Sequence, residues 1–376
     1  MTSIPFVDLA AQQQRIGASI RQRIDVVLDH GQFINGPEIV ELEAALAVRS
    51  GVPHVVACAS GTDALLMVLM TLGVGPGDAV LVPAFTFVAT AEAVVLAGAT
   101  PVFCDVRTDT FNLDPDQIGR GEAAARAAGL RPVGVIPVDL FGQPAEYSRL
   151  AAEAEAYGLW VFADAAQSLG GSVDGRAVGA LADLTATSFF PAKPLGCYGD
   201  GGAIFVTDES IAGALRSIRE HGRGAHRYET VRVGLTGRLD TIQAAVLLAK
   251  LEVFDDEIER RQQVATRYDE GLADRAVVPF VLPDFRSAWA QYTIRVTDRD
   301  GVASALAADG VPTAVYYPKP LHRQPPYVDC PRADPALVRS EMLGGEVLSL
   351  PMHPYLEAAV QDRIIGATIR AIGATS

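Results

Sequence analysis

The stretch Leu159-Trp-Val-Phe-Ala-Asp164-Ala-Ala-Gln167 predicts a strand that is buried on both faces and ends in a carboxylate. Similar β-rich runs recur on either side of it, separated by amphipathic stretches of helical period. The runs are 55–60, 79–83, 101–105, 134–138, 184–188 and 203–207, and the helical stretches include 61–73, 87–98 and 145–157. This alternation predicts a largely parallel sheet covered by helices on both faces. No long helix separates the last two runs, so at least one strand is expected to be antiparallel.

The length and composition of the chain fit a large domain followed by a smaller one. The chain has 376 residues, of which 49% are hydrophobic and 20% charged, enough for a sizeable core. After residue 209 the pattern becomes helical, and near residue 280 a second α+β unit begins. Its expected elements are strands at 291–296 and 313–317 and a closing helix at 356–372. We therefore expect an N-terminal arm and large domain at 1–250 and a small domain at 251–376.

Composition also excludes several classes of function. The formal charge of −14 argues against a nucleic-acid surface. The four cysteines lie far apart without metal-ligand spacing, so reduced, mostly buried thiols are expected, with neither disulfides nor a metal site. No segment is apolar enough to span a membrane, and the N-terminus lacks the features of a signal peptide. We expect a cytoplasmic protein.

Lys193 is unusual because the chain has only three lysines against 28 arginines. A lysine whose pKa is lowered by its site becomes a neutral nucleophile and can form a Schiff base, which arginine cannot. The alternative is a surface lysine beside a glycine-rich turn. Asp164 and Gln167 follow a strand, where ligands gather in open α/β sheets. An aspartate there suits the protonated ring nitrogen of pyridoxal phosphate, although an isolated Asp164 would be interpreted as a helix N-cap, and both roles are compatible.

A phosphate would need its own binding turn, which Ala59-Ser-Gly-Thr-Asp-Ala-Leu65 offers between a strand and a helix. Backbone N–H groups at such a helix start suit an anion, although Ser-Gly-Thr turns are common. Ser188 ends another β-like run, so its hydroxyl could reach the same phosphate. Phe87 or Phe85 could lie flat on a pyridine ring, or either could belong to the core.

Five motifs of this chain occur in the order seen in one known family. They are Ser60-Gly-Thr-Asp-Ala-Leu65, Pro83-Ala-Phe-Thr-Phe87, Asp164-Ala-Ala-Gln167, Ser188-Phe-Phe-Pro-Ala-Lys193 and Gly199-Asp-Gly-Gly202. On these motifs the chain resembles the DegT/DnrJ/EryC1/StrS sugar aminotransferases over essentially its whole length. The resemblance implies the α/β fold-type I architecture of pyridoxal-phosphate enzymes, with a mostly parallel seven-stranded sheet and a smaller C-terminal α+β domain. It also implies a homodimer with active sites at the interface.

The resemblance assigns roles to individual residues. It places Lys193 in the Schiff base and the proton shuttle, Asp164 at the ring nitrogen, Gln167 at the ring hydroxyl, Phe87 on a ring face, and Gly61, Thr62 and Ser188 at the phosphate. Most members have an asparagine that reaches this phosphate across the dimer, and Thr236 occupies its position here. A threonine can still donate one hydrogen bond. A dehydratase branch of the family replaces the lysine by histidine, so Lys193 favours transamination.

The resemblance further implies that glutamate donates the amino group, that pyridoxamine phosphate carries it, and that a nucleotide-linked keto sugar accepts it. The diphosphate needs cations or hydrogen-bond donors, although each candidate could equally be a solvated surface residue. The candidates are Arg227, Tyr228, Tyr316, Lys319 and His322, with His221, Arg223 and His226.

The segments 188–202, 237–251 and 316–322 are most similar to enzymes that aminate UDP-2-acetamido-2-deoxy-3-oxo-glucuronate at C3 for surface polysaccharides. An alternative is C3 or C4 amination of a dTDP-6-deoxy keto sugar for an antibiotic. Two alternatives come from other classes. One is a non-catalytic regulator that binds pyridoxal phosphate, and the other is a non-enzymatic ligand-binding protein in which Asp164 and Lys193 form an ion pair.

Overall fold

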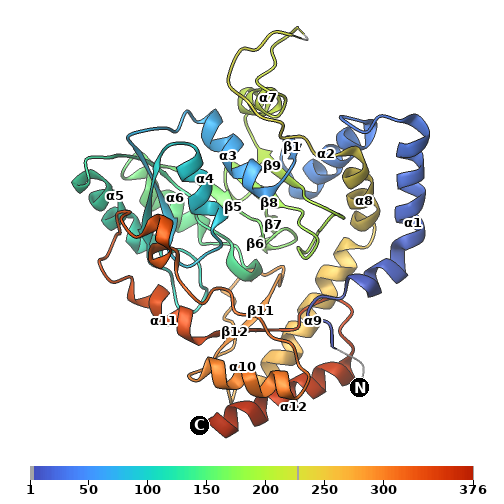
Figure 1. The fold of residues 1–376 in the computed structure, drawn as a ribbon, viewed down its shortest axis with the longest axis vertical. Coiled ribbons are helices and arrows are strands. Elements are labelled where there is room, and N and C mark those ends of the chain that lie inside the picture. Colours follow the sequence, from blue (N-terminus) through green and yellow to red (C-terminus); the bar gives the residue numbers. More distant parts are fainter. Residues whose placement is uncertain (1–3, 227, 376) are drawn as a thin grey trace.

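The computed structural model describes residues 4–226 and 228–375, and its main element is a seven-stranded sheet with the order β1-β9-β8-β5-β4-β2-β3 (Figure 1). The strands are β1 His54–Cys58, β2 Asp78–Pro83, β3 Thr100–Cys104, β4 Arg131–Val135, β5 Trp160–Asp164, β8 Leu184–Ser188 and β9 Gly202–Val206. β9 is antiparallel to its neighbours β1 and β8, and the remaining neighbours pair in parallel. The predicted mostly parallel sheet with a reversed strand is therefore confirmed.

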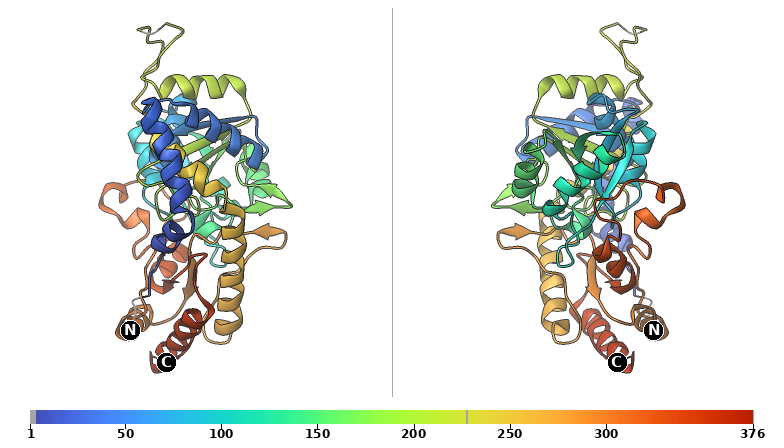
Figure 2. Two further views of the ribbon diagram at one scale, coloured as in Figure 1. Left: turned by 90° about the vertical axis from the view of Figure 1, so that its right-hand side faces the viewer. Right: turned by 90° about the vertical axis from the view of Figure 1, so that its left-hand side faces the viewer.

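Helices cover both faces of this sheet (Figures 1 and 2). They are α2 Pro37–Ser50, α3 Gly61–Thr71, α4 Ala89–Leu96, α5 Ile118–Ala127, α6 Tyr147–Glu155, α7 Glu209–Ile218 and α8 Thr241–Leu251. Successive residues of a strand point to opposite faces. In β2, Val80 and Val82 pack in the layer of α3, α4 and α7, whereas Ala79 and Leu81 pack in the layer of α5 and α6. The second layer continues over β1 and β9 with α2 and α8.

The N-terminal helix α1 Leu9–His30 packs along α8 at the edge of the molecule (Figure 1). Ile16 and Ile20 of α1 form a buried cluster with Val246 and Ala249 of α8. Ahead of α1, Ile4 is buried among the residues of the C-terminal unit. The arm therefore contacts both units of the chain.

The C-terminal unit has a hydrophobic core of its own. It consists of α9 Phe254–Leu272, α10 Arg299–Ala308 and α12 Ala358–Thr375 around the antiparallel pair β11 Tyr292–Arg295 and β12 Val347–Leu350. The strand predicted at 313–317 is wrong, since only Ala314 pairs there, in an isolated bridge with Ser349. Pro312 and Pro318 flank the segment and have no N–H to donate to a ladder. The division at 250/251 falls at the end of α8 and stays a prediction.

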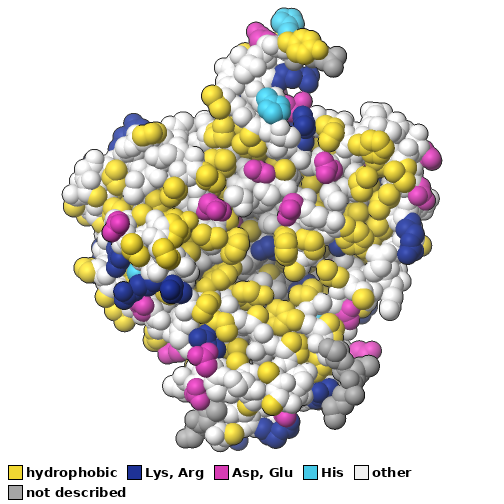
Figure 3. Space-filling view, viewed as in Figure 1, with side chains coloured by type: hydrophobic (Ala, Val, Ile, Leu, Met, Phe, Trp, Pro, Cys, Tyr) yellow, Lys and Arg dark blue, Asp and Glu magenta, His cyan; other side chains and the backbone are white. Residues whose placement is uncertain are grey.

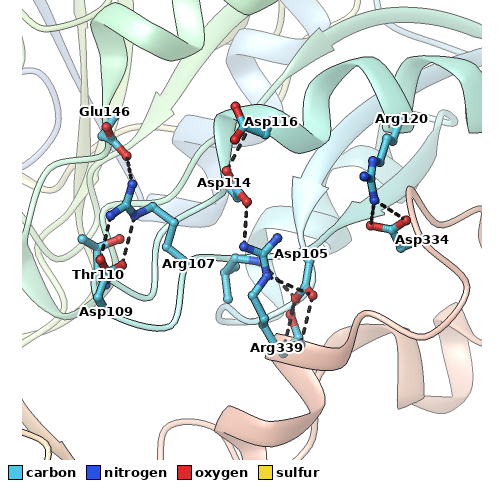
Figure 4. Close-up of polar contacts among 12 residues, drawn as sticks. Asp105, Arg107, Asp109, Thr110, Asp114, Asp116, Arg120, Glu146, Asp334 and Arg339 are labelled. Carbon is cyan, nitrogen blue, oxygen red and sulfur yellow. Dashed lines mark hydrogen bonds and ion pairs between the residues drawn. The ribbon is translucent and has the colours of Figure 1, made fainter.

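Part of the C-terminal sequence returns to the large sheet and is tied to it by polar contacts (Figure 4). Leu321, Tyr327 and Leu337 belong to the core cluster of the sheet. The carboxylate of Asp105, at the end of β3, accepts hydrogen bonds from the backbone N–H of Ser340 (2.8 Å) and from its hydroxyl (2.6 Å). Asp105 thereby caps the start of α11 Val338–Glu346. Neither link was predicted from the sequence.

Short elements complete the described chain. They are the three-stranded sheet of β10 Phe285–Arg286, β6 Ser172–Val173 and β7 Arg176–Ala177, and the 3-10 turns η1 Pro115–Gln117, η2 Leu140–Gly142, η3 Leu321–Arg323 and η4 Pro325–Tyr327. All four cysteines are free thiols, three of them buried. Over residues 4–226 and 228–375, none of the helices combines the length and hydropathy needed to cross a bilayer. The same residues contain no cluster of three metal-binding side chains.

Candidate active site

Asp164 is the last residue of β5, and its carboxylate lies buried at the carboxyl edge of the sheet. One oxygen, Oδ2, accepts a hydrogen bond from the Thr90 hydroxyl of α4 at 2.8 Å. The other, Oδ1, accepts from the backbone N–H of Ala166 at 3.2 Å. Burial raises the pKa of Asp164, while these two donors and the charge of Lys193 oppose that rise. The site thus supplies several stabilising partners to the ionised form.

Lys193 lies in the loop that follows β8, the parallel neighbour of β5. The carboxyl ends of parallel neighbours meet at one edge of a sheet, which brings Lys193 close enough to Asp164 for their charges to interact. Burial lowers the pKa of the Lys193 amine to about 8, and Asp164 opposes this change. Lys193 remains partly exposed. An amine with this pKa is partly neutral near physiological pH, as a nucleophile requires.

The turn at the start of α3 and the end of β8 form a narrow cradle. Ser60 caps α3, and its hydroxyl accepts a hydrogen bond from the backbone N–H of Asp63 at 3.0 Å. The first intrahelical bond runs from Ala64 to Ser60, which places the N–H groups of Gly61 and Thr62 ahead of the hydrogen-bonded turns. A Cβ on Gly61 would lie 2.8 Å from Cβ of Ser188. Glycine at 61 therefore allows the helix start and the Ser188 hydroxyl to face one small space.

Gln167 is buried one short turn after Asp164. Its side-chain oxygen accepts a hydrogen bond from the backbone N–H of Phe141 at 2.7 Å. Burial raises the pKa of the nearby Tyr317 hydroxyl, and Gln167 opposes that rise. Of the two phenylalanines considered for stacking, Phe85 is fully buried and Phe87 is exposed. The ring of Phe87 lies 6.0 Å from that of Tyr317. Phe87 is thus the one that a ligand could reach.

Asp139 is a second buried carboxylate at this edge, and sequence reasoning missed it. It follows β4, and its backbone N–H donates to the carbonyl of Asp164 at 3.0 Å. Its side chain accepts hydrogen bonds from the hydroxyls of Ser168 (2.5 Å) and Tyr147 (2.6 Å). Burial raises the pKa of Asp139 to about 7 despite these donors. Asp139 holds Ser168, and through it the backbone next to Gln167.

Thr236 lies apart from this group, at the base of a segment that projects from the end of α7 (Figures 1 and 2). Its exposed hydroxyl is hydrogen-bonded to Nε2 of His221 at 2.8 Å. The backbone of Thr236 pairs with Glu220 in an isolated bridge. Thr236, which is expected to replace an asparagine of the family, therefore has a histidine partner.

The predicted sugar-binding residues are not brought together in the described chain. Arg227 lies outside the described residues, and its neighbour Tyr228 is 89% exposed on the projecting segment. Tyr316 is partly buried, with its ring 5.7 Å from that of Tyr317, and Lys319 is exposed. His322 has no exposed surface, and its Nε2 is hydrogen-bonded to Glu341 at 2.8 Å. In this conformation a substrate would not reach His322.

The family model for "DegT/DnrJ/EryC1/StrS aminotransferase family" matches residues 14–369 of this chain. The chain belongs to this aminotransferase family. A curated relative, the UDP-2-acetamido-2-deoxy-3-oxo-D-glucuronate aminotransferase of Pseudomonas aeruginosa, is 49% identical over 357 residues, covering 95% of this chain and 97% of the relative. The dTDP-3-amino-3,4,6-trideoxy-alpha-D-glucose transaminase of Streptomyces venezuelae is 38% identical, covering 97% of this chain and 95% of the relative.

A solved structure of a family aminotransferase from Brucella abortus has a TM-score of 0.95 and 51% sequence identity, covering 97% of this chain and 98% of that chain. Together these similarities confirm the family, the fold-type I architecture and the class of enzyme predicted from the sequence, a pyridoxal-phosphate-dependent sugar aminotransferase. They exclude the interpretation as a non-enzymatic binding protein. The roles of individual site residues stay predictions.

Proposed function

We propose that this aminotransferase moves the amino group of glutamate to C3 of UDP-2-acetamido-2-deoxy-3-oxo-glucuronate, with pyridoxal phosphate as its cofactor. The observation that carries the reaction type is the meeting of Lys193, Asp164 and the Gly61–Ser188 cradle at one edge of the sheet. The choice of sugar is supported by the 49% identity to the P. aeruginosa relative over nearly the full length of both chains.

The residues at this edge fit the cofactor. The N–H groups of Gly61 and Thr62 and the Ser188 hydroxyl would bind its phosphate, and a side chain at position 61 would fill the space. Asp164 would hold the proton of the ring nitrogen, which requires the ionised carboxylate that Thr90 stabilises. Gln167 would bind the ring hydroxyl and Phe87 would cover a ring face.

Lys193 would do the proton work of both half-reactions. When bound, pyridoxal phosphate supplies an electron-withdrawing ring that acidifies the hydrogen on the α-carbon of glutamate. The Lys193 Nζ would first hold the aldehyde carbon, then take this proton from glutamate, and later return one to C3 of the sugar. Because 2-oxoglutarate leaves before the keto sugar enters, the kinetics would be ping-pong.

The working unit is proposed to be a homodimer. The projecting segment exposes Val231 (53%), Val233 (81%) and Tyr228, and the turn after α1 exposes Phe33 and Ile34. Figure 3 shows hydrophobic side chains (yellow) spread widely over this face. Large exposed apolar areas mark association surfaces in soluble proteins. Thr236 and the residues of the projecting segment would then serve the site of the partner subunit, together with Tyr316 and Lys319.

The reverse reaction gives the most direct test, since it starts from stable amino sugars. Purified protein should be yellow after loading with pyridoxal phosphate, and borohydride should fix the cofactor to Lys193. With 2-oxoglutarate and the 3-amino product of the proposed sugar, the loaded enzyme should form glutamate. A panel of dTDP-linked 3-amino and 4-amino sugars tests the second candidate, which the S. venezuelae relative favours. Turnover of a dTDP sugar alone would overturn the proposed substrate, and a protein that binds no pyridoxal phosphate would overturn the mechanism.

A further inference from the structure

Lys250 is a second buried lysine, and it contacts the loop that carries Lys193. It lies on α8 with 2% of its surface exposed. Its Nζ donates a hydrogen bond to the backbone carbonyl of Gly196 at 2.5 Å. Gly196 comes three residues after Lys193 in the sequence. Helix α8 thus contacts the loop that carries Lys193 through a buried amine.

Backbone hydrogen bonds join the two ends of the loop between Phe189 and Cys197, so a contact that fixes Gly196 restrains the whole loop. The N–H of Cys197 donates to the carbonyl of Phe189 at 2.8 Å, and the N–H of Lys193 donates to Phe190 at 2.8 Å. A Cβ on Gly196 would lie 2.6 Å from the carbonyl oxygen of Phe190. Gly196 is therefore pressed against the backbone turn from which Lys193 projects, and the two cannot move independently.

The same helix holds the loop at a second point. Tyr198 donates its backbone N–H to the side-chain oxygen of Gln243 at 2.8 Å, and Gln243 lies on α8 two turns before Lys250. The amine of Lys250 also lies 4.7 Å from the centre of the Tyr198 ring, within the range of a cation–π contact. The loop is thus fastened to α8 on both sides of Cys197.

A buried lysine is a costly way to bind one carbonyl. Burial lowers the pKa of Lys250 to about 8, against the raising influence of Glu257 and Cys197. A leucine or methionine at this place would pack on α8 without that cost, so simple core packing does not account for an amine here. What the amine adds is a directed bond to the loop backbone.

We propose that Lys250 is a positioning residue that fastens the Lys193 loop to α8 and thereby sets where the Lys193 amine stands relative to Asp164. The effect on catalysis rests on the proposed function. The restraint of the loop by Lys250 is independent of the proposed function, because it depends only on contacts within this chain.

The test compares Lys250→Met with Arg261→Met in the cofactor-loaded protein. Arg261 is a matched control because it is also buried and also donates to a backbone carbonyl, that of Trp289 at 2.8 Å, away from the Lys193 loop. Hydrogen exchange of the peptide 189–199 measures how firmly the loop is held, and steady-state kinetics measure the effect on catalysis. A hydrogen bond from a charged donor corresponds to roughly tenfold or more. We expect Lys250→Met to speed exchange in this peptide and to lower kcat by about that factor, with KM for glutamate changed less than about threefold.

Arg261→Met should lower the melting temperature without either effect. Lys250→Arg keeps a cationic donor and should recover much of the protection and of kcat; it also serves if Lys250→Met does not fold. The proposal would be overturned if the exchange rate of the peptide 189–199 increased no more in Lys250→Met than in Arg261→Met. If the wild-type chain proves inactive, the proposed function fails, but the exchange experiment still decides whether Lys250 fastens the loop.

Discussion

Thr90 offers a sharp test of how Asp164 is kept ionised. Its hydroxyl donates to Oδ2 of Asp164 at 2.8 Å, and both side chains are buried, at 1% and 4% exposure. Thr90→Val keeps the shape of the side chain and removes only this donor. The pKa of Asp164, already raised by burial, should rise further because the ionised form loses a partner.

The size of the effect follows from the charge on the acceptor. A hydrogen bond to a charged group contributes about 1.5–3 kcal/mol, which corresponds to roughly a ten- to hundredfold change in an equilibrium or a rate. We expect Thr90→Val to weaken pyridoxal phosphate binding or to lower kcat within that range. Absorbance titration of the cofactor-free protein and glutamate half-reaction kinetics would separate the two.

The stability change of Thr90→Val should depend on pH in a defined direction. The folded pKa of Asp164 lies above its unfolded value, so its ionisation opposes folding once the pH exceeds the unfolded value. The variant adds to this penalty, and the loss should shrink as the pH falls and Asp164 becomes protonated. Thr368→Val is the matched control, since Thr368 is also buried but donates to the carbonyl of Ile364 in α12. A Thr90→Val protein with wild-type cofactor affinity and kcat would refute the role assigned to Thr90.

Three further predictions follow from the site. Lys193→Ala and Lys193→Arg should abolish turnover, and glutamate formation in either variant would contradict the mechanism. The Lys193 amine without cofactor has a pKa of about 8, and only its neutral form condenses with an aldehyde, so the rate of cofactor uptake should rise with pH and level off above about 8. Asp164→Asn should lower the midpoint of this pH dependence, since Asp164 raises the pKa of Lys193. Gly61→Ala places a Cβ 2.8 Å from Cβ of Ser188 and should weaken cofactor binding about tenfold or more by titration, and this overpacking should also lower the melting temperature.

The sequence predicted the sheet well because burial on both faces leaves a clear signal. The apolar runs of β2, β5 and β8 and the reversed strand β9 were expected within a few residues of their place. The run 134–138 was displaced, since the strand is β4 Arg131–Val135 and its register with β2 shifts between Ala79 and Val80. At 313–317 β-branched and aromatic residues suggested a strand, but only Ala314 pairs there, with Ser349.

Some residues of the candidate site were predicted from the sequence and others were missed. Asp164 was found because it ends a strand, where ligands gather in open α/β sheets, and Lys193 because it is one of three lysines and lies in a family motif. Thr90 and Asp139 were missed because their roles depend on hydrogen bonds between elements far apart in the sequence. A threonine in the first turns of a helix has no signal that distinguishes it from a packing residue. His322 was named for its motif, whereas its burial against Glu341 depends on how α11 packs.

The two buried lysines show why a lowered pKa alone does not identify a nucleophile. Burial lowers the pKa of both Lys193 and Lys250 to about 8, so both amines are partly neutral near physiological pH. They differ in solvent exposure and in the residues that surround them. Lys193 is partly exposed and interacts with Asp164 beside the Gly61 cradle, whereas Lys250 is 2% exposed and its amine is bonded to Gly196. Borohydride should therefore label Lys193 alone. Since the Lys250 amine is hydrogen-bonded to the loop that carries Lys193, Lys250→Met should also slow labelling of Lys193.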